Sequence, residues 1–331
     1  MIEKPAVSRA FLLRSVSLWG GDRSCALRVL RALAHCCRHI AVQCLAMNNS
    51  YPIGVFDSGF GGLTVAHAIH ELLPRESIIY VGDSARCPYG PRPQREVRGY
   101  VREICSWLTG QGVKLIVIAC NTATAAGLAM AQKEFEVPVI GVVEPGARAA
   151  ARATINRKVG VIATQGTVDS CAYSDAIRAR DAGVTVFSTA TPRFVEIVED
   201  GLRRSDSPIE KITADASDVY LRPAFTEIAR DYLDPLKRIG IDTLVLGCTH
   251  FPILAPLIQQ SVGNGVKLIS SAEETAKDVR STLKSREQLN DGPEDGAFLR
   301  FYTTGDDIED FKSLARRVLR MDEVDVRHLT L

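Results

Sequence analysis

Short, almost entirely apolar runs alternate with stretches of helical spacing from Tyr51 to the end of the chain. The predicted strands are Ile53–Phe56, Ser77–Val81, Leu115–Ala119, Val139–Val143, Val159–Ala163, Val184–Ser188, Thr243–Leu246, Lys267–Ile269 and Arg300–Thr304. The predicted helices include Leu63–Leu73, Gln94–Leu108, Thr122–Glu134 and Asp307–Leu319. This alternation predicts an α/β fold with mainly parallel sheets, and such apolar strands are typical of sheets that helices cover on both faces.

The two halves of this region resemble each other in sequence. The run Ile53–Gly59 corresponds to Val159–Thr167, because each is an apolar strand that leads into a turn containing glycine. The run Leu115–Thr122 corresponds to Leu244–Thr249, because each strand ends in a cysteine that polar residues follow. The chain therefore carries the pattern of an internal duplication.

This duplication predicts two similar lobes, each a mainly parallel sheet flanked by helices. We assign residues 51–146 plus 268–331 to the first lobe and residues 147–267 to the second, and we treat residues 1–50 as an N-terminal extension. Ligands of open α/β sheets bind beyond the carboxyl ends of the strands. The predicted active site therefore lies in the cleft between the lobes, with one cysteine on each wall.

The composition is that of an ordinary globular protein and argues against several function classes. The 331 residues are enough for two modest domains. The net charge of +1 and the low aromatic content argue against nucleic-acid binding, and no apolar run reaches the roughly 18 residues of a membrane span. Nine cysteines at irregular spacing, with no CxxC pair, predict a cytoplasmic protein without a structural zinc site.

Two segments differ from the α/β pattern. Between Arg9 and Met47 there are several arginines and one acidic residue, Asp22, and Cys25–Ala46 has the pattern of a basic, partly amphipathic helix. We favour an over-long translation start with Met47 as the natural initiator. A disordered or regulatory extension and a targeting or membrane-surface segment are the alternatives. The polar stretch Asp200–Asp218 is expected to be an insertion, or a loop and helix.

The two cysteines at matching strand ends are the candidate catalytic groups. Cys120 stands between an apolar strand and a helix, where backbone N–H groups and the positive helix end favour a thiolate. Cys248 repeats this arrangement in the second half. Either cysteine alone would be interpreted as a buried inert residue, but structural cysteines have no reason to follow an internal symmetry. Two opposed thiols suit proton exchange at a stereocentre, in which a base removes a proton from one face and an acid delivers one to the other.

Neighbouring titratable groups must hold one cysteine as a thiolate and the other as a thiol. Asp57 ends the first strand and precedes a turn rich in glycine, where the backbone can closely approach an anion; a helix cap is its alternative role. His250 lies two residues after Cys248 and either polarises that thiol or only serves as a hydrogen-bonding group at the start of a helix.

These residues resemble the glutamate racemases of the aspartate/glutamate racemase superfamily. The resemblance covers about residues 51–331, and its motifs occur in the family's order. The matching stretches are Ile53–Thr64, Tyr80–Asp83, Pro88-Tyr89-Gly90, Ala119–Ala123, Gly247–Pro252, the weaker Ser271–Ala276 and Thr304-Gly305-Asp306.

The resemblance implies a racemase that needs neither pyridoxal phosphate nor a metal and that supplies D-glutamate for peptidoglycan. In this view Cys120 acts on D-glutamate and Cys248 on L-glutamate, while Asp57 and His250 assist their respective cysteines. An assisting glutamate is expected between Thr191 and Glu199, and Glu199 fits best. The expected substrate contacts are Asp57, Ser58, Tyr89, Gly90, Asn121, Thr122, Thr249 and His250. The only expected partner besides glutamate is a second copy of the chain, in a homodimer.

The sequence departs from the family at two positions and leaves alternatives open. Thr191-Pro192 stands where the family often has Cys-Pro, and Ser270 stands where it often has Asp, so the local shape of the pocket is in question. The nearest rival is a racemase of aspartate or a hydantoin, although His250 together with Pro88-Tyr89-Gly90 favours glutamate. The other rival is a non-catalytic binding protein on the same scaffold, which would not need thiols at mirrored sites. A further regulatory role toward other proteins is also open.

Overall fold

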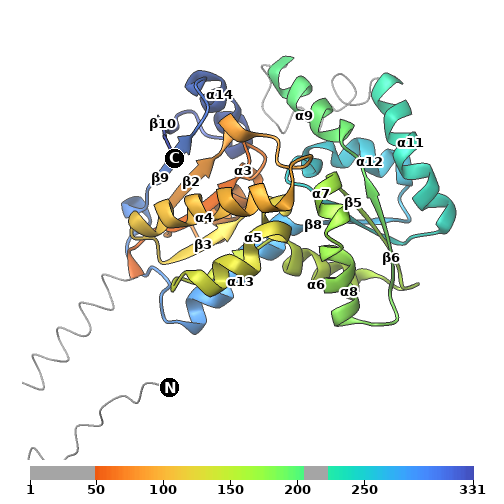
Figure 1. Ribbon diagram of the computed structural model, residues 1–331, viewed down its shortest axis with the longest axis horizontal. Coiled ribbons are helices and arrows are strands. Elements are labelled where there is room, and N and C mark those ends of the chain that lie inside the picture. The colour runs from red at the N-terminus through yellow and green to blue at the C-terminus, as the bar shows by residue number, and fades with distance from the viewer. Residues whose placement is uncertain (1–48, 205–222) are drawn as a thin grey trace, which may run out of the picture. The chain divides into compact units, whose positions relative to one another are not determined.

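The computed structural model describes residues 49–204 and 223–331 (Figure 1). Both halves of the α/β region belong to one structural unit that begins at Asn49. The predicted basic helix at 25–46 and most of the polar stretch at 200–218 lie outside the described residues. Within the described ranges, no helix is both long and apolar enough to cross a membrane.

A six-stranded parallel sheet forms the first half, in the order β10-β9-β2-β1-β3-β4. Its strands are β1 (Ile53–Asp57), β2 (Ile78–Gly82), β3 (Leu115–Ile118), β4 (Val139–Gly141), β9 (Leu299–Thr303) and β10 (Asp325–His328). Successive side chains of a strand point to opposite faces. Accordingly, Val55 packs with the α3 side of the core, whereas Phe56 packs with the α4 side.

Helices cover both faces of this sheet. On one face α4 (Gln94–Gly110) and α5 (Asn121–Glu134) pack side by side (Figure 1). On the other face α3 (Leu63–Leu72) packs against α13 (Ser271–Ser285) and α14 (Ile308–Leu319). The near-continuous apolar strands are therefore buried on both sides, as the sequence pattern predicts.

The second half is a four-stranded parallel sheet in the order β6-β5-β7-β8. Its strands are β5 (Lys158–Ala163), β6 (Thr185–Ala190), β7 (Thr243–Gly247) and β8 (Lys267–Ser270). The helices α6 (Val143–Ala153), α7 (Gln165–Asp169) and α8 (Ala172–Arg180) precede or connect its strands, as do α9 (Arg193–Arg204), α11 (Pro223–Ile239) and α12 (Ala255–Val262). Three short 3₁₀ turns complete the described elements: η1 (Ser84–Arg86), η2 (Phe251–Leu254) and η3 (Glu294–Gly296).

The topology confirms the predicted α/β class with two similar halves. The order β2-β1-β3-β4 in the first sheet corresponds to β6-β5-β7-β8 in the second. The exact lobe boundaries stay a prediction, but the boundary at 267/268 falls within β8, which pairs with β7 in the second sheet. The predicted strand Val139–Val143 is also shorter in the structure, because β4 ends at Gly141 and α6 begins at Val143.

Candidate active site

The two candidate thiols follow equivalent strands of the two sheets. Cys120 comes after β3 and is the N-cap of α5, while Cys248 comes directly after β7. Both residues are buried but keep a small exposed fraction, which is 6% for Cys120 and 7% for Cys248. Negative charge on Cys248 is one of the causes that raise the pKa of Cys120, so the two groups lie within electrostatic range of each other.

The surroundings of Cys120 favour its neutral form, although its place at the start of α5 predicted a thiolate, because burial outweighs the helix end. Its Sγ accepts a hydrogen bond from the backbone N–H of Ala123 at 3.4 Å and lies 3.8 Å from the hydroxyl of Ser58. Burial, assisted by the negative charge of Asp57, raises the pKa of Cys120 to about 12. At neutral pH this group is therefore a thiol that can donate a proton.

Cys248 has a cation as its neighbour. Its Sγ lies 3.7 Å from Nδ1 of His250, and Nε2 of the same ring lies 3.5 Å from a carboxylate oxygen of Glu199 on α9. Burial alone would lower the pKa of His250, but the hydrogen bond to Cys248 and the ion pair with Glu199 raise it to about 10. The ring of His250 thus lies between the second thiol and the glutamate that the sequence singled out, and its raised pKa favours the imidazolium form.

Asp57 connects the first half to the second. It is fully buried at the end of β1, and its carboxylate accepts hydrogen bonds from the backbone N–H of Gly59 at 3.1 Å and from Oγ1 of Thr249 at 3.4 Å. Burial raises the pKa of Asp57, although the positive charge of His250 opposes this effect. Asp57 therefore acts electrostatically on Cys120 and also contacts the residue next to Cys248.

The glycines of the first turn permit this approach. A Cβ at Gly62 would lie 2.5 Å from Cβ of Asp57, and a Cβ at Gly61 would lie 2.5 Å from Oγ1 of Thr249. Both distances are far below van der Waals contact, so a side chain at either position would push the start of α3 away from the site. Gly62 thus allows close packing within the first half, and Gly61 allows close packing against the second half.

The loop that carries Tyr89 and Gly90 faces the second half. Tyr89 is 1% exposed, and its hydroxyl donates to the buried carboxylate of Asp83. Burial, followed by the charge of Asp83, raises the pKa of Tyr89, and Cys120 adds to this shift. The carbonyl of Gly90 accepts a hydrogen bond from the N–H of Gly166 in α7 at 3.0 Å.

Several polar groups at the site were not predicted from the sequence. The hydroxyls of Thr164 and Thr167 lie 3.1 Å apart, and Thr164 lies 2.8 Å from the hydroxyl of Thr122 in the first half. Both threonines belong to the turn Ala163–Thr167, which repeats the Asp57 turn in sequence. The internal duplication was therefore a signal that could have identified them.

A third thiol, Cys87, was also missed. It shares a hydrogen-bonding partner, Ser58, with Cys120. Burial raises the pKa of Cys87 above its usual range, and the negative charges of Glu199 and Asp57 add to this increase. Its position in front of the Pro88-Tyr89-Gly90 motif was the only sequence signal.

Asn121 is buried beside Cys120 and is 2% exposed. Its side-chain oxygen accepts a hydrogen bond from Tyr173 at 2.7 Å, whereas its Nδ2 has no hydrogen-bond partner among the described residues. The predicted residues of the two halves thus form one polar cluster around the thiols, in which the Nδ2 donor of Asn121 has no partner among the described residues.

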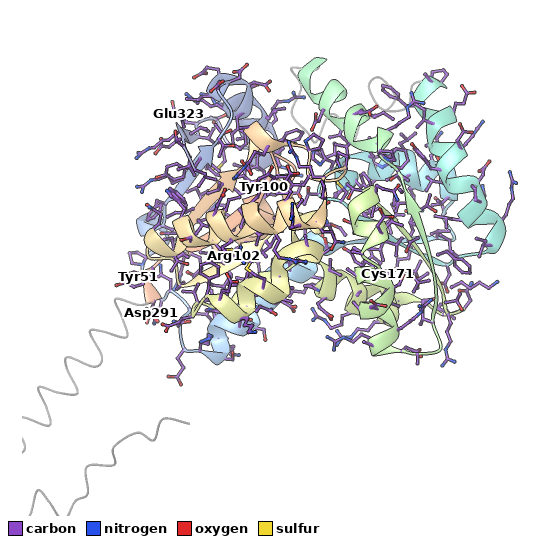
Figure 2. The ribbon with its side chains drawn as sticks, viewed as in Figure 1. Tyr51, Tyr100, Arg102, Cys171, Asp291 and Glu323 are labelled. Atoms are coloured by element: carbon purple, nitrogen blue, oxygen red, sulfur yellow. The ribbon has the colours of Figure 1, made fainter. Side chains whose placement is uncertain are left out.

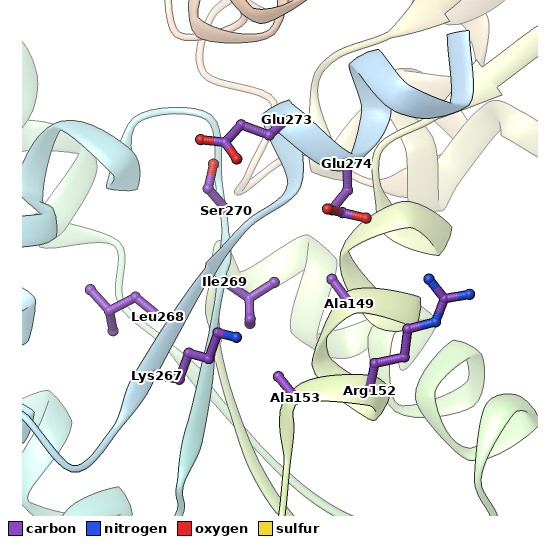
Figure 3. A pocket seen from close by; sticks show the side chains of 9 residues that line it. All are labelled: Ala149, Arg152, Ala153, Lys267, Leu268, Ile269, Ser270, Glu273 and Glu274. Carbon is purple, nitrogen blue, oxygen red and sulfur yellow. The ribbon is translucent and has the colours of Figure 1, made fainter. Parts of the chain in front are cut away.

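A separate pocket of about 430 Å³ lies between α6, β8 and the start of α13 (Figure 3). Exposed charged side chains such as Arg152, Lys267 and Glu273 line it, together with Ser270. None of the predicted catalytic residues lines this pocket. In the described part of the chain, no group of three or more His, Cys, Asp or Glu side chains could hold a metal ion.

This chain is similar to known proteins in sequence and in fold. Residues 53–279 match the sequence model of the family described as Asp/Glu/Hydantoin racemase. A glutamate racemase from Listeria innocua is 44% identical over 279 residues, which cover 84% of this chain and 98% of that relative. The structure of a glutamate racemase isoform from Bacillus anthracis is 41% identical with a TM-score of 0.76, covering 85% of this chain and 98% of its own. A glutamate racemase from Francisella tularensis in complex with D-glutamate has 31% identity, the same two coverages and a TM-score of 0.74.

Proposed function

The chain belongs to the glutamate racemases of the Asp/Glu/Hydantoin racemase family, and from this premise we propose that it interconverts L- and D-glutamate with two thiols. Cys248, as the thiolate, removes the α-proton of L-glutamate, and the electron pair of the C–H bond stays on the substrate. Cys120, as the thiol, delivers a proton to the opposite face. D-glutamate leaves with Cys248 protonated and Cys120 ionised, which is the starting state for the reverse reaction.

The charges around the thiols support this division of roles. The imidazolium of His250 is a counter-ion for negative charge on Cys248 at 3.7 Å. Cys120 faces the negative charge of Asp57 and is held as a thiol, since its pKa is raised to about 12. The observation on which the proposal chiefly rests is that two thiols of unlike surroundings follow equivalent strands, β3 and β7, of the duplicated fold.

The main barrier is the weak acidity of the α-carbon, and hydrogen-bond donors are the available means of lowering it. Negative charge develops on the α-carboxylate as the proton leaves. The donors that lie around the thiols are the free Nδ2 of Asn121, the start of α5 and the hydroxyl of Ser58. Donors that are already in place stabilise such charge without having to reorganise.

The test is racemisation in deuterated water without added cofactor. L- and D-glutamate should both gain deuterium at Cα in step with inversion, and Cys120→Ser and Cys248→Ser should each lose most of the turnover. Cys171→Ser is the matched control, because Cys171 is exposed at the start of α8 (Figure 2). Wild-type turnover in both site variants would exclude the two-thiol mechanism, and faster turnover of aspartate than of glutamate would exclude the substrate.

The resemblance to the family also supports a cellular role. We propose that the racemisation needs no cofactor. We also propose that the D-glutamate formed enters peptidoglycan synthesis in the cytoplasm. The homodimer stays a prediction, and light scattering of the purified protein would test it.

A further inference from the structure

Tyr173 contacts the sequence neighbours of both candidate thiols, Gly247 and Asn121, although it belongs to neither cysteine motif. It is in the first turn of α8 and is 2% exposed. Its ring fits between two glycines: a Cβ at Gly146 would lie 3.3 Å from Cε1, and a Cβ at Gly247 would lie 3.1 Å from Cε2. Gly247 directly precedes Cys248, so the ring packs against the strand end that carries the second thiol.

The hydroxyl of Tyr173 contacts the other half of the molecule. It donates a hydrogen bond to Oδ1 of Asn121 at 2.7 Å. Ser271, the first residue of α13, is its second hydrogen-bonding partner. Burial raises the pKa of Tyr173, so the hydroxyl keeps its proton and remains a donor. The side-chain amide of Asn121, which follows Cys120 directly, is thereby held at its oxygen end.

This contact determines what Asn121 presents to a ligand. Since Oδ1 is occupied by Tyr173, the Nδ2 group remains as the free end of the amide, and it has no partner among the described residues. A buried donor without a partner is costly, which indicates that a bound ligand completes its hydrogen bonding. An N–H donor matches a carboxylate and repels an ammonium group, so the ligand group must be an acceptor.

We propose that Tyr173 is a positioning residue, which holds the amide of Asn121 with its N–H group toward the α-carboxylate of the bound amino acid. This inference rests on the proposed racemisation of glutamate. Without the hydroxyl, the amide is free to turn its oxygen toward the carboxylate, which exchanges an attraction for a repulsion. The loss should be greatest in the transition state, where the carboxylate carries more charge.

The test is a double-mutant cycle between Tyr173→Phe and Asn121→Ala. Tyr173→Phe keeps the ring between the two glycines and should lower kcat/KM by about tenfold, as expected for one buried hydrogen bond. Asn121→Ala should lower it by about 100-fold through loss of the donor. In the Asn121→Ala background, adding Tyr173→Phe should cost less than about twofold, because the residue acts through the amide.

Two further variants keep the test decisive. Ser271→Ala removes the second partner of the hydroxyl and should cause a smaller loss than Tyr173→Phe. Tyr232→Phe removes a hydroxyl from a tyrosine whose ring packs on Phe194, and it should retain wild-type turnover. Additive losses in the cycle, or wild-type turnover of Tyr173→Phe, would overturn the positioning role while leaving the racemase proposal intact. An inactive wild-type protein would instead refute the proposed function.

Discussion

At the scale of single residues, the site is chemically asymmetric although the fold is duplicated. One thiol is next to a cation and the other faces a carboxylate, so the two halves have unlike charges at equivalent strand ends. The proposed two-thiol mechanism needs this asymmetry, because one thiol must be a base while the other is an acid. The groups that create it, Asp57 and His250, should therefore affect the two proton transfers differently.

His250→Asn should slow the transfer at Cys248 selectively. Because L- and D-glutamate have equal free energies, kcat/KM must fall equally in both directions, by about 10- to 100-fold. The primary isotope effect should separate the two steps. It should rise with α-deuterated L-glutamate, since C–H cleavage at Cys248 becomes limiting, and fall with α-deuterated D-glutamate. Equal changes in both isotope effects would contradict the assignment of His250 to Cys248.

The raised pKa of His250 also predicts how stability depends on pH. The folded protein binds a proton at His250 up to a pKa of about 10, whereas the unfolded chain releases it near 6.5. The contribution is fully present below the lower value and is lost as pH rises toward the upper one, by at most about 1.4 kcal/mol per pH unit. Denaturant titrations from pH 6.5 to about 8, below the ordinary cysteine pKa of 9.0, should show this decline.

The control for this prediction is the His250→Asn protein over the same pH range. Its free energy of unfolding should vary less with pH, because the group that takes up the proton is absent. Asp57, whose pKa burial also raises, is present in both proteins. Parallel curves for the two proteins would show that folding takes up no net proton through His250.

At the scale of elements, the sequence was most informative where the pattern is periodic. The apolar runs predicted β1, β3, β5 and β7, because a strand buried on both faces has few polar residues. The prediction from sequence failed where the apolar pattern is weak. The edge strand β10, with the sequence Asp-Val-Arg-His, was not predicted, and the start of α6 was interpreted as part of a strand, since a short apolar run does not separate the two.

The turn between β1 and α3 gives a prediction about packing at an element boundary. Gly62→Ala should destabilise the fold by about 1–3 kcal/mol and reduce turnover, because the new Cβ would overlap Asp57 and Ala119. Its backbone is already helical (φ −66°), so any loss comes from the overlap rather than from strain. Thermal denaturation and the racemisation assay measure both effects.

Gly99→Ala is the matched control for this turn. Gly99 lies inside α4 and has open space around the position of a Cβ. Alanine is the better helix former, so this change should stabilise the protein by up to about 1 kcal/mol and leave turnover unchanged. If both variants behaved alike, the close approach at Gly62 would have no special role.

At the scale of the whole molecule, the sequence could not predict which side chains meet across the two halves. Asp57 bonds to Thr249 and Asn121 to Tyr173, across separations of 192 and 52 residues. Such contacts depend on how the sheets are placed against each other, which no local pattern records. The duplication predicted that the thiols lie at equivalent strand ends, but their hydrogen-bonding partners come from tertiary packing.

The contact between Gly90 and Gly166 tests whether turnover depends on the approach of the two halves. A Cβ at Gly166 would lie 2.9 Å from the carbonyl oxygen of Gly90 and 3.2 Å from Thr122. Gly166→Ala should therefore push the Tyr89 loop away from α7, while each half keeps its own core. Since alanine suits the helical backbone of α7, we expect an unchanged melting temperature together with a loss in kcat/KM of about tenfold or more.

Gly265→Ala separates this effect from the general effect of an added methyl group. Gly265 is in the second half, is exposed and has open space where a Cβ would lie, so its variant should match the wild-type protein in both assays. The two thiols are in different halves, and the proposed mechanism requires both to be within reach of one α-carbon. A Gly166→Ala protein with full turnover would mean that the halves need not come this close. A large fall in melting temperature would mean that the contact stabilises the fold instead of assembling the site.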